Sequence, residues 1–248
     1  MSSKESATTH YAMWSVFQTA NTLPEDALER KDMVREALRA VNGAAGGSPA
    51  GLTVRGWYDL SGMRSDADLM VWWHATTVEA VQGAYQRLRQ SELGRCLDPI
   101  WSNVGVYRAD TGADTDSDTD AEAGGTTQPA FLESGEPGAY LSVSPLGYSQ
   151  DWYQLQAEER SRLLAEQAQS LAQHAGVRTS TVAAFALGDF EWLRAVEAPE
   201  LHQLVDASRA LRSTAAGHHV REDTPVFAGP RTDLNSWAAR QPLSDYDA

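Results

Sequence analysis

Six histidines are the side chains of this sequence best suited to bind a metal ion or to move a proton near neutral pH. They do not occur in the spacings that build a metal site, such as HExxH or bridging carboxylates. His218 and His219 are adjacent, and on an extended strand they would point to opposite faces. The lone Cys96 excludes a multi-cysteine metal site. Spacing alone therefore predicts no metal centre.

One histidine, His174, lies on the same predicted helical segment as Gln167. The run "LLAEQAQSLAQHAG" (163–176) places His174 seven residues after Gln167, which is about two helical turns. The two side chains share a helix face but are separated by about 10 Å along the axis. His174 also precedes Gly176 at the expected helix end, where the helix dipole favours a histidine. A capping or surface role is the simpler interpretation of His174.

The charge of the chain narrows the classes of function. Its 248 residues carry a formal net charge of −14, and nucleic-acid binding requires a basic surface, so a nucleic-acid partner is not expected. No apolar run approaches the length of a transmembrane helix, and the N-terminus lacks the apolar segment of a signal peptide. We therefore expect a soluble, cytoplasmic protein with no membrane partner.

Much of the acidity lies in one segment, residues 109–128, with the sequence "ADTGADTDSDTDAEAGGTTQ". It has no aromatic residue to bury and is rich in Gly, Ser and Thr, so it is predicted to be a disordered loop. It lacks the glycine and the terminal glutamate of a calcium-binding EF-hand loop. The predicted organisation is an N-terminal half at 10–108, this acidic loop, a C-terminal half at 129–232 and a tail at 233–248.

The two halves repeat one order of predicted elements. The first has a strand at 11–19, a helix at about 24–41, strands in "LTVRGWYDL" and "DLMVWWHAT", and a helix in "TVEAVQGAYQRLRQSEL". The second has a strand in "AYLSVSP", a helix at 157–174, strands in "STVAAFAL" and "EWLRAVEA", and a helix in "PELHQLVDASRALRST". The order β-α-β-β-α predicts an α+β fold of two fused ferredoxin-like halves, a dimeric α/β barrel, with antiparallel sheets.

Four runs in series are more specific: "MWSVF", "RGWYDLSGMRSDADLMVWWHA", "ALGDFEW" and "HHVREDTPVFAG". In these runs the chain resembles the actinobacterial coproheme decarboxylases, which are members of the chlorite dismutase family. The resemblance extends from about Tyr11 to Arg231. It implies a pocket for haem or coproheme in the C-terminal half, oxidoreductase chemistry and a homopentamer.

The positions that carry the chemistry of that family are changed here. The resemblance aligns the iron-binding histidine of the long helix with Gln167, and the radical-forming tyrosine with Ser144. It aligns two arginines with Tyr148 and Gly217, and the distal histidine with Thr127. An amide is a poorer ligand for ferric iron than imidazole. Serine has no ring to stabilise a radical, and the lost arginines are the usual partners of carboxylates.

We therefore expect a divergent member of the family whose pocket takes a porphyrin-type or other small flat ligand, with altered or lost decarboxylase chemistry. The expected lining residues are Ser144, Tyr148, Gln167 and Thr127. If the protein is an enzyme, we expect a haem-family oxidoreductase with changed chemistry, in which the Tyr148 hydroxyl supplies redox or acid–base chemistry.

Arg212 and Arg221 remain as candidate partners for a carboxylate of the ligand, although surface ion pairing explains them equally well.

Two alternatives stay open. The first is a haem-binding enzyme of haem biosynthesis, a coproheme decarboxylase or peroxidase, with His174 as an unusual axial ligand of the iron. The second is a non-catalytic subunit that assembles with an intact paralogue. A cofactor-free oxygenase is supported by analogy of fold alone.

Overall fold

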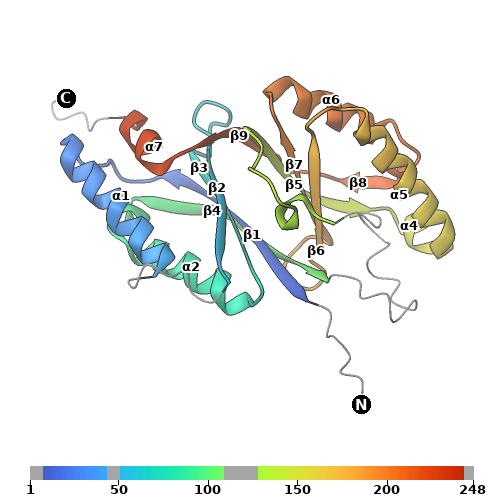
Figure 1. Ribbon diagram of the computed structural model, residues 1–248, viewed down its shortest axis with the longest axis horizontal. Helices are drawn as coiled ribbons and strands as arrows, with labels where there is room; N and C mark the ends of the chain where they lie inside the picture. Colours follow the sequence, from blue (N-terminus) through green and yellow to red (C-terminus); the bar gives the residue numbers. More distant parts are fainter. Residues whose placement is uncertain (1–7, 44–50, 109–127, 243–248) are drawn as a thin grey trace, which may run out of the picture. The chain divides into compact units, whose positions relative to one another are not determined.

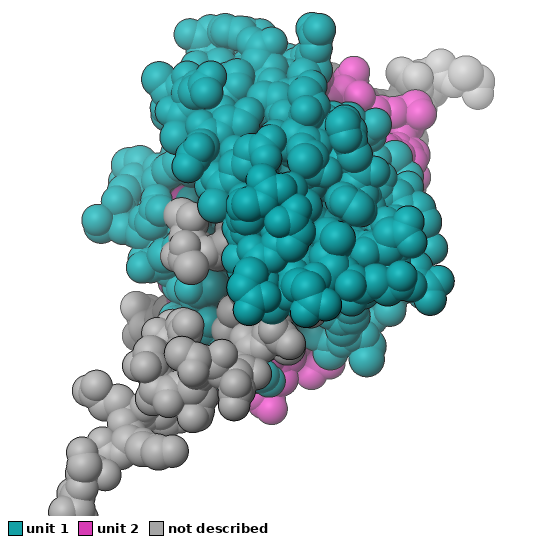
Figure 2. Space-filling view, turned by 90° about the vertical axis from the view of Figure 1, so that its right-hand side faces the viewer, with its two compact units in different colours: residues 1–10, 103–228 teal, residues 11–102, 229–248 magenta. Residues whose placement is uncertain are grey.

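The computed structural model describes residues 8–43, 51–108 and 128–242 (Figure 1). The acidic loop predicted at 109–128 therefore lies outside the described residues except for its last position, and Thr127 lies outside them as well. The chain divides into two compact units, coloured separately in Figure 2. Unit 1 contains residues 1–10 and 103–228, and unit 2 contains residues 11–102 and 229–248. The boundaries fall within three strands.

Unit 2 is built on antiparallel strands. Its elements are β1 (Thr9–Thr19), α1 (Ala27–Asn42), β2 (Thr53–Asp59), β3 (Leu69–Ala75), α2 (Val78–Gln90), α3 (Glu92–Arg95), the first half of β4 (Leu97–Arg108), the end of β9 (Phe227–Thr232), and α7 (Leu234–Arg240). Strand β3 pairs with β1 and with β2. Trp14 and Trp72 are directly opposite each other on β1 and β3 and are both fully buried, so aromatic side chains fill this core.

Within the segment predicted as a C-terminal tail at 233–248, residues Leu234–Arg240 form helix α7. Asp233 caps it by accepting a hydrogen bond from the backbone N–H of Ser236 at 2.9 Å. Trp237 is fully buried, and its indole N–H donates to the carbonyl of Asp68 at 3.0 Å. Trp237 thus helps to anchor the helix, and a seven-residue helix is too short to show a periodic pattern in the sequence.

Unit 1 carries the second set of elements. They are the remainder of β4, the 3₁₀ turn η1 (Ala130–Leu132), β5 (Tyr140–Tyr148), α4 (Gln150–Gln154), α5 (Ala157–Ala172), β6 (Arg178–Ala183), β7 (Trp192–Ala198), α6 (Leu201–Arg212), η2 (Ala216–His219) and β8 (Val220–Glu222). Strand β7 pairs antiparallel with both β5 and β6. Helices α5 and α6 lie along one side of these strands (Figure 1).

The predicted α+β class and antiparallel pairing are confirmed. Strands β4, β8 and β9 are absent from the prediction, as is α7. His218 and His219 lie in a 3₁₀ turn rather than on an extended strand, because the backbone turns there before β8 begins. No helix within the described ranges is both long enough and apolar enough to cross a membrane.

Candidate functional site

A cavity of about 370 Å³ lies in unit 1, between helix α5 and the helix-facing side of strands β6 and β7. This volume is within the range of small-molecule sites in proteins. Its lining is mixed, with apolar side chains such as Leu164, Leu171 and Trp192 beside a few polar ones. The polar and charged lining residues are Tyr107, Gln128, Glu133, Gln167, Arg178, Thr179, Thr181 and Arg194.

The strand register decides which side chains face this cavity. Arg194 on β7 is directly opposite Thr181 on β6 and directly opposite Ser144 on β5. Opposed residues of antiparallel strands project from the same face of the sheet. Arg194 and Thr181 line the cavity, so Ser144 projects from the cavity side of the sheet as well. Ser144 is not itself among the lining residues, and its short side chain lies beside Arg194 on this face.

Gln167 reaches the cavity from the helix side. The buried residues of α5 are Arg160, Leu163, Leu164 and Gln167, which recur at helical spacing and form the stripe that packs against unit 1. Gln167 is 6% exposed and lines the cavity. Gln167 is therefore part of the wall of this cavity, and its role in binding a ligand stays a prediction.

The hydroxyl of Thr214 orients the side-chain amide of Gln167, because all its hydrogen-bonding capacity is used. Thr214 donates its hydroxyl proton to the carbonyl of Leu211 at 2.7 Å. The same oxygen accepts the backbone N–H of Gly217 at 3.1 Å and the side-chain N–H of Gln167 at 3.4 Å. A hydroxyl has one proton to donate and two lone pairs to accept with, so all its capacity is used. Gln167 must present its nitrogen to Thr214, and its Oε1 has no partner among the described residues.

The backbone beside this bond requires a glycine. A Cβ atom added to Gly217 would lie 2.2 Å from the carbonyl oxygen of Leu211 and 2.9 Å from backbone atoms of Arg212. Backbone cannot move away as a flexible side chain can. Gly217 is the position at which the family resemblance places an arginine, so no arginine side chain fits here without rebuilding this turn.

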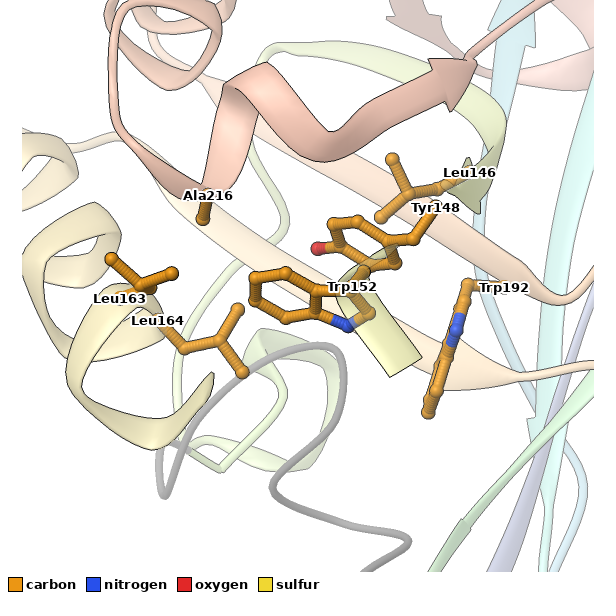
Figure 3. Packing of buried hydrophobic residues seen from close by; sticks show 7 residues of the cluster. All are labelled: Leu146, Tyr148, Trp152, Leu163, Leu164, Trp192 and Ala216. Atoms are coloured by element: carbon orange, nitrogen blue, oxygen red, sulfur yellow. The ribbon is translucent and has the colours of Figure 1, made fainter. Parts of the chain in front are cut away.

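Tyr148 lies in the aromatic core next to the cavity and not in the cavity lining. Its ring stacks on Trp152 with 4.4 Å between ring centroids (Figure 3). The residue is 1% exposed, and its hydroxyl makes no hydrogen bond within the described part of the chain. Burial raises the pKa of the Tyr148 hydroxyl, and the nearby guanidinium of Arg194 offsets part of that rise.

Arg194 is a site residue that the sequence analysis missed. It lines the cavity, and its Nη2 atom is buried with no hydrogen-bond partner among the described residues. The available signal was the strand alternation in "EWLRAVEA", which places Arg194 on the same face as the buried Trp192 and Val196. A cation among buried apolar residues of one strand face is unusual and indicates function.

Hydrogen bonds hold the indole of Trp192 as one wall of the cavity. Its N–H donates to the hydroxyl of Tyr153 at 3.4 Å, and that hydroxyl donates to the carboxylate of Glu191 at 2.7 Å. The same carboxylate oxygen accepts the backbone N–H of Tyr148 at 3.2 Å. The carboxylate thus connects the Trp192 wall to the end of β5 that carries Tyr148.

The remaining predicted residues lie elsewhere. His174 follows the end of α5 and is partly buried, and it is not a lining residue. Arg212 is exposed and forms an ion pair with Asp223, while Arg221 is exposed on β8. Neither arginine lines the cavity. In the described ranges, no group of three or more His, Cys, Asp or Glu residues could hold a metal ion.

The chain has clear similarity to known proteins. A sequence profile described as "Chlorite dismutase" matches residues 30–232. The coproheme decarboxylase of Mycolicibacterium smegmatis (strain ATCC 700084 / mc(2)155) is 43% identical over 238 residues, which cover 95% of this chain and 96% of the relative.

Solved structures show the same fold. Chlorite dismutase from Candidatus Nitrospira defluvii, solved as a variant and in complex with imidazole, matches with a TM-score of 0.73 at 24% identity, over 95% of both chains. A putative chlorite dismutase matches with a TM-score of 0.72 at 18% identity, over 94% of this chain and 98% of that one. The two ferredoxin-like halves predicted from the order of elements are confirmed by these likenesses.

Proposed function

This chain belongs to the chlorite dismutase family, and from that premise we propose that its cavity binds a porphyrin or another flat ligand without strong axial ligation. We further propose that coproheme decarboxylation, the activity in the name of the 43% identical relative, is altered or lost in this chain. Membership of the family supports a haem-type ligand. The residues that line the cavity support the proposal that the decarboxylase chemistry is altered or lost.

The observation that carries the proposal is Gln167. It is the residue that α5 presents to the cavity at the position where the family resemblance places the iron-binding histidine. Its side-chain N–H donates a hydrogen bond to the hydroxyl oxygen of Thr214. A neutral amide is a weak ligand for ferric iron compared with imidazole.

The lining fits the ring of a porphyrin better than it fits the iron. Leucines of α5 and α6 and the indole of Trp192 provide the apolar walls that a flat aromatic ring requires. Arg178 and Arg194 add positive charge that suits the carboxylates of such a ligand. No histidine, cysteine or methionine lines the cavity in the described part of the chain, so the residues present do not supply imidazole or sulfur ligation. Haem, when bound, would supply redox chemistry.

Ser144 and Tyr148 are proposed as neighbours of the bound ligand. Ser144 lies on the cavity face of the sheet opposite Arg194, at the position of the family tyrosine. Tyr148 keeps its proton at neutral pH because burial raises the pKa of its hydroxyl. If the protein is an enzyme, Tyr148 can donate a hydrogen bond or a proton and cannot act as a base at neutral pH.

The direct test is a visible-absorption titration of the purified, metal-free protein with ferric coproporphyrin and with haem. A saturable shift of the Soret band at one equivalent per chain is expected. An absorption spectrum that stays that of the free porphyrin at micromolar protein would contradict the proposal. His174→Ala leaves the shift unchanged if His174, which does not line the cavity, is not the axial ligand.

A further inference from the structure

The helix side of the cavity carries the side-chain amide of Gln167 in an otherwise apolar wall. Gln167 is 6% exposed and lines the cavity, so its amide is removed from bulk solvent. A buried polar atom without a partner costs free energy, so the unmet hydrogen bonds of this amide determine which ligands the wall favours. The other described lining residues from α5 and α6 are apolar: Leu164, Ala168, Leu171, Ala172 and Leu211.

Thr214 determines which end of this amide is left for the cavity. Its hydroxyl donates to the carbonyl of Leu211 at 2.7 Å and accepts the side-chain N–H of Gln167 at 3.4 Å. With the amide turned the other way, two oxygen atoms would meet with no proton between them. The amide nitrogen therefore faces Thr214, and Oε1 has no hydrogen-bond partner among the described residues. The helix wall thus presents an unmatched acceptor.

An acceptor in an apolar wall is complementary to a ligand that donates a hydrogen bond. A water molecule can meet this need in an open cavity, and a ligand that displaces it without donating loses affinity. The leucines of the helix wall and the indole of Trp192 favour a flat aromatic surface. A ring N–H group satisfies both conditions, because the donor is part of the flat ring itself.

We propose that Gln167 Oε1 accepts a hydrogen bond from the ligand of this cavity, which makes the ligand a flat heteroaromatic molecule that carries a ring N–H group. A tetrapyrrole without a metal ion belongs to this class, because a bound metal ion replaces the protons on its inner nitrogens. The residue that the family resemblance aligns with an iron ligand then recognises a proton donor. The inference deepens the proposed function and rests on the cavity being a ligand site.

Two three-ring compounds that differ in one group test this preference. Carbazole has a ring N–H where dibenzofuran has an oxygen atom, and the two have nearly the same shape. Equilibrium dialysis measures the binding of each compound. We expect the wild-type protein to bind carbazole roughly threefold to tenfold more tightly, which corresponds to one net hydrogen bond. Gln167→Leu is expected to bind the two compounds equally.

Substitutions of Thr214 test the orientation of the amide. Thr214→Val removes the hydroxyl that holds the amide nitrogen, so the amide is free to turn and the preference for carbazole is expected to fall. Thr214→Ser keeps the hydroxyl and is expected to keep the preference. The matched control is Gln173→Leu, which removes an exposed glutamine at the end of α5 and is expected to behave as wild type. Circular dichroism of each variant confirms that it is folded.

The outcomes separate the hydrogen bond to Gln167 from the porphyrin pocket. If the wild type binds neither compound, if it binds both equally, or if Gln167→Leu keeps the preference, the inference is wrong even where ferric coproporphyrin shifts its Soret band. If carbazole is preferred through Gln167 but no porphyrin binds, the inference stands and the porphyrin proposal fails. If neither compound and no porphyrin binds, both are wrong.

Discussion

Gln167 donates its side-chain N–H to the hydroxyl oxygen of Thr214, at a distance of 3.4 Å, and both residues are buried. The bond joins α5 to the turn after α6, 47 residues away in the sequence. Thr214 has already given its proton to Leu211, so this contact fixes which end of the amide faces the helix turn. The residue that the family resemblance aligns with an iron ligand is therefore an amide held in place by Thr214, and its carbonyl oxygen has no hydrogen-bond partner among the described residues.

Replacing Thr214 tests the hydroxyl at the centre of this arrangement. Thr214→Val removes the acceptor of two N–H groups, from Gln167 and Gly217, while keeping the shape of the side chain. Buried donors left without partners are costly, so we expect a loss of about 1–3 kcal/mol in the free energy of unfolding, measured with urea. Thr214→Ser keeps the hydroxyl and is expected to lose less. Equal stability of the valine variant and the wild type would contradict this account.

Substitutions of Gly217 test whether the arginine that the family resemblance places at this position can be restored. Gly217→Ala places a Cβ against the Leu211 carbonyl, and Gly217→Arg adds a long side chain at the same point. We expect both to destabilise the protein by at least about 1–3 kcal/mol, as overpacking does. The control is Gly83→Ala on α2, where the nearest atom belongs to the flexible end of Arg87 and alanine favours a helix. Neutral behaviour of both Gly217 variants in thermal unfolding would show that the turn is free to move.

Much of the fold could be predicted from the sequence. The long periodic segments give clear signals, and the helix predicted at 157–174 occurs at Ala157–Ala172. Strand β4 was missed because Pro99 and a partly exposed face hide its alternation. The short elements β8, β9 and α7 were missed because they contain too few residues to establish a period.

The site was harder to predict because its contacts join residues that are distant in the sequence. Gln167 could be singled out from the family pattern, but its bond to Thr214 could not. Arg194 needed the strand register, which brings it opposite Ser144. Tyr148 was expected in the pocket wall, yet it lies behind the wall because its ring stacks on Trp152.

Tyr148 and Tyr153 form a matched pair for a second stability test. The hydroxyl of Tyr148 has no hydrogen bond among the described residues, whereas that of Tyr153 donates to Glu191 and accepts from Trp192. In the ligand-free protein at pH 7, we expect Tyr148→Phe to change the free energy of unfolding by less than about 0.5 kcal/mol. Tyr153→Phe is expected to lose about 1 kcal/mol or more. The opposite order in urea denaturation would refute this assignment of partners.

The Tyr148 hydroxyl also predicts a dependence of stability on pH. Burial raises its pKa in the folded state above that of the unfolded chain, which is about 10. The folded state therefore holds the proton more tightly, so its contribution is fully present below about pH 10 and is lost as the pH rises through the folded pKa. Urea unfolding between pH 8 and pH 11 is expected to show a smaller alkaline loss of stability in Tyr148→Phe than in wild type. Identical pH profiles would remove Tyr148 as the cause.

If Gln167 stands in place of the iron-binding histidine, a ferric porphyrin bound in the cavity lacks imidazole ligation, and absorption spectroscopy detects this directly. The absorption spectrum of the ferric coproporphyrin complex is recorded for the wild type and for Gln167→His under identical conditions. We expect the wild-type complex to lack the signature of imidazole-ligated iron and the histidine variant to acquire it. A wild-type spectrum that already shows imidazole ligation, and that Gln167→His leaves unchanged, would contradict the account.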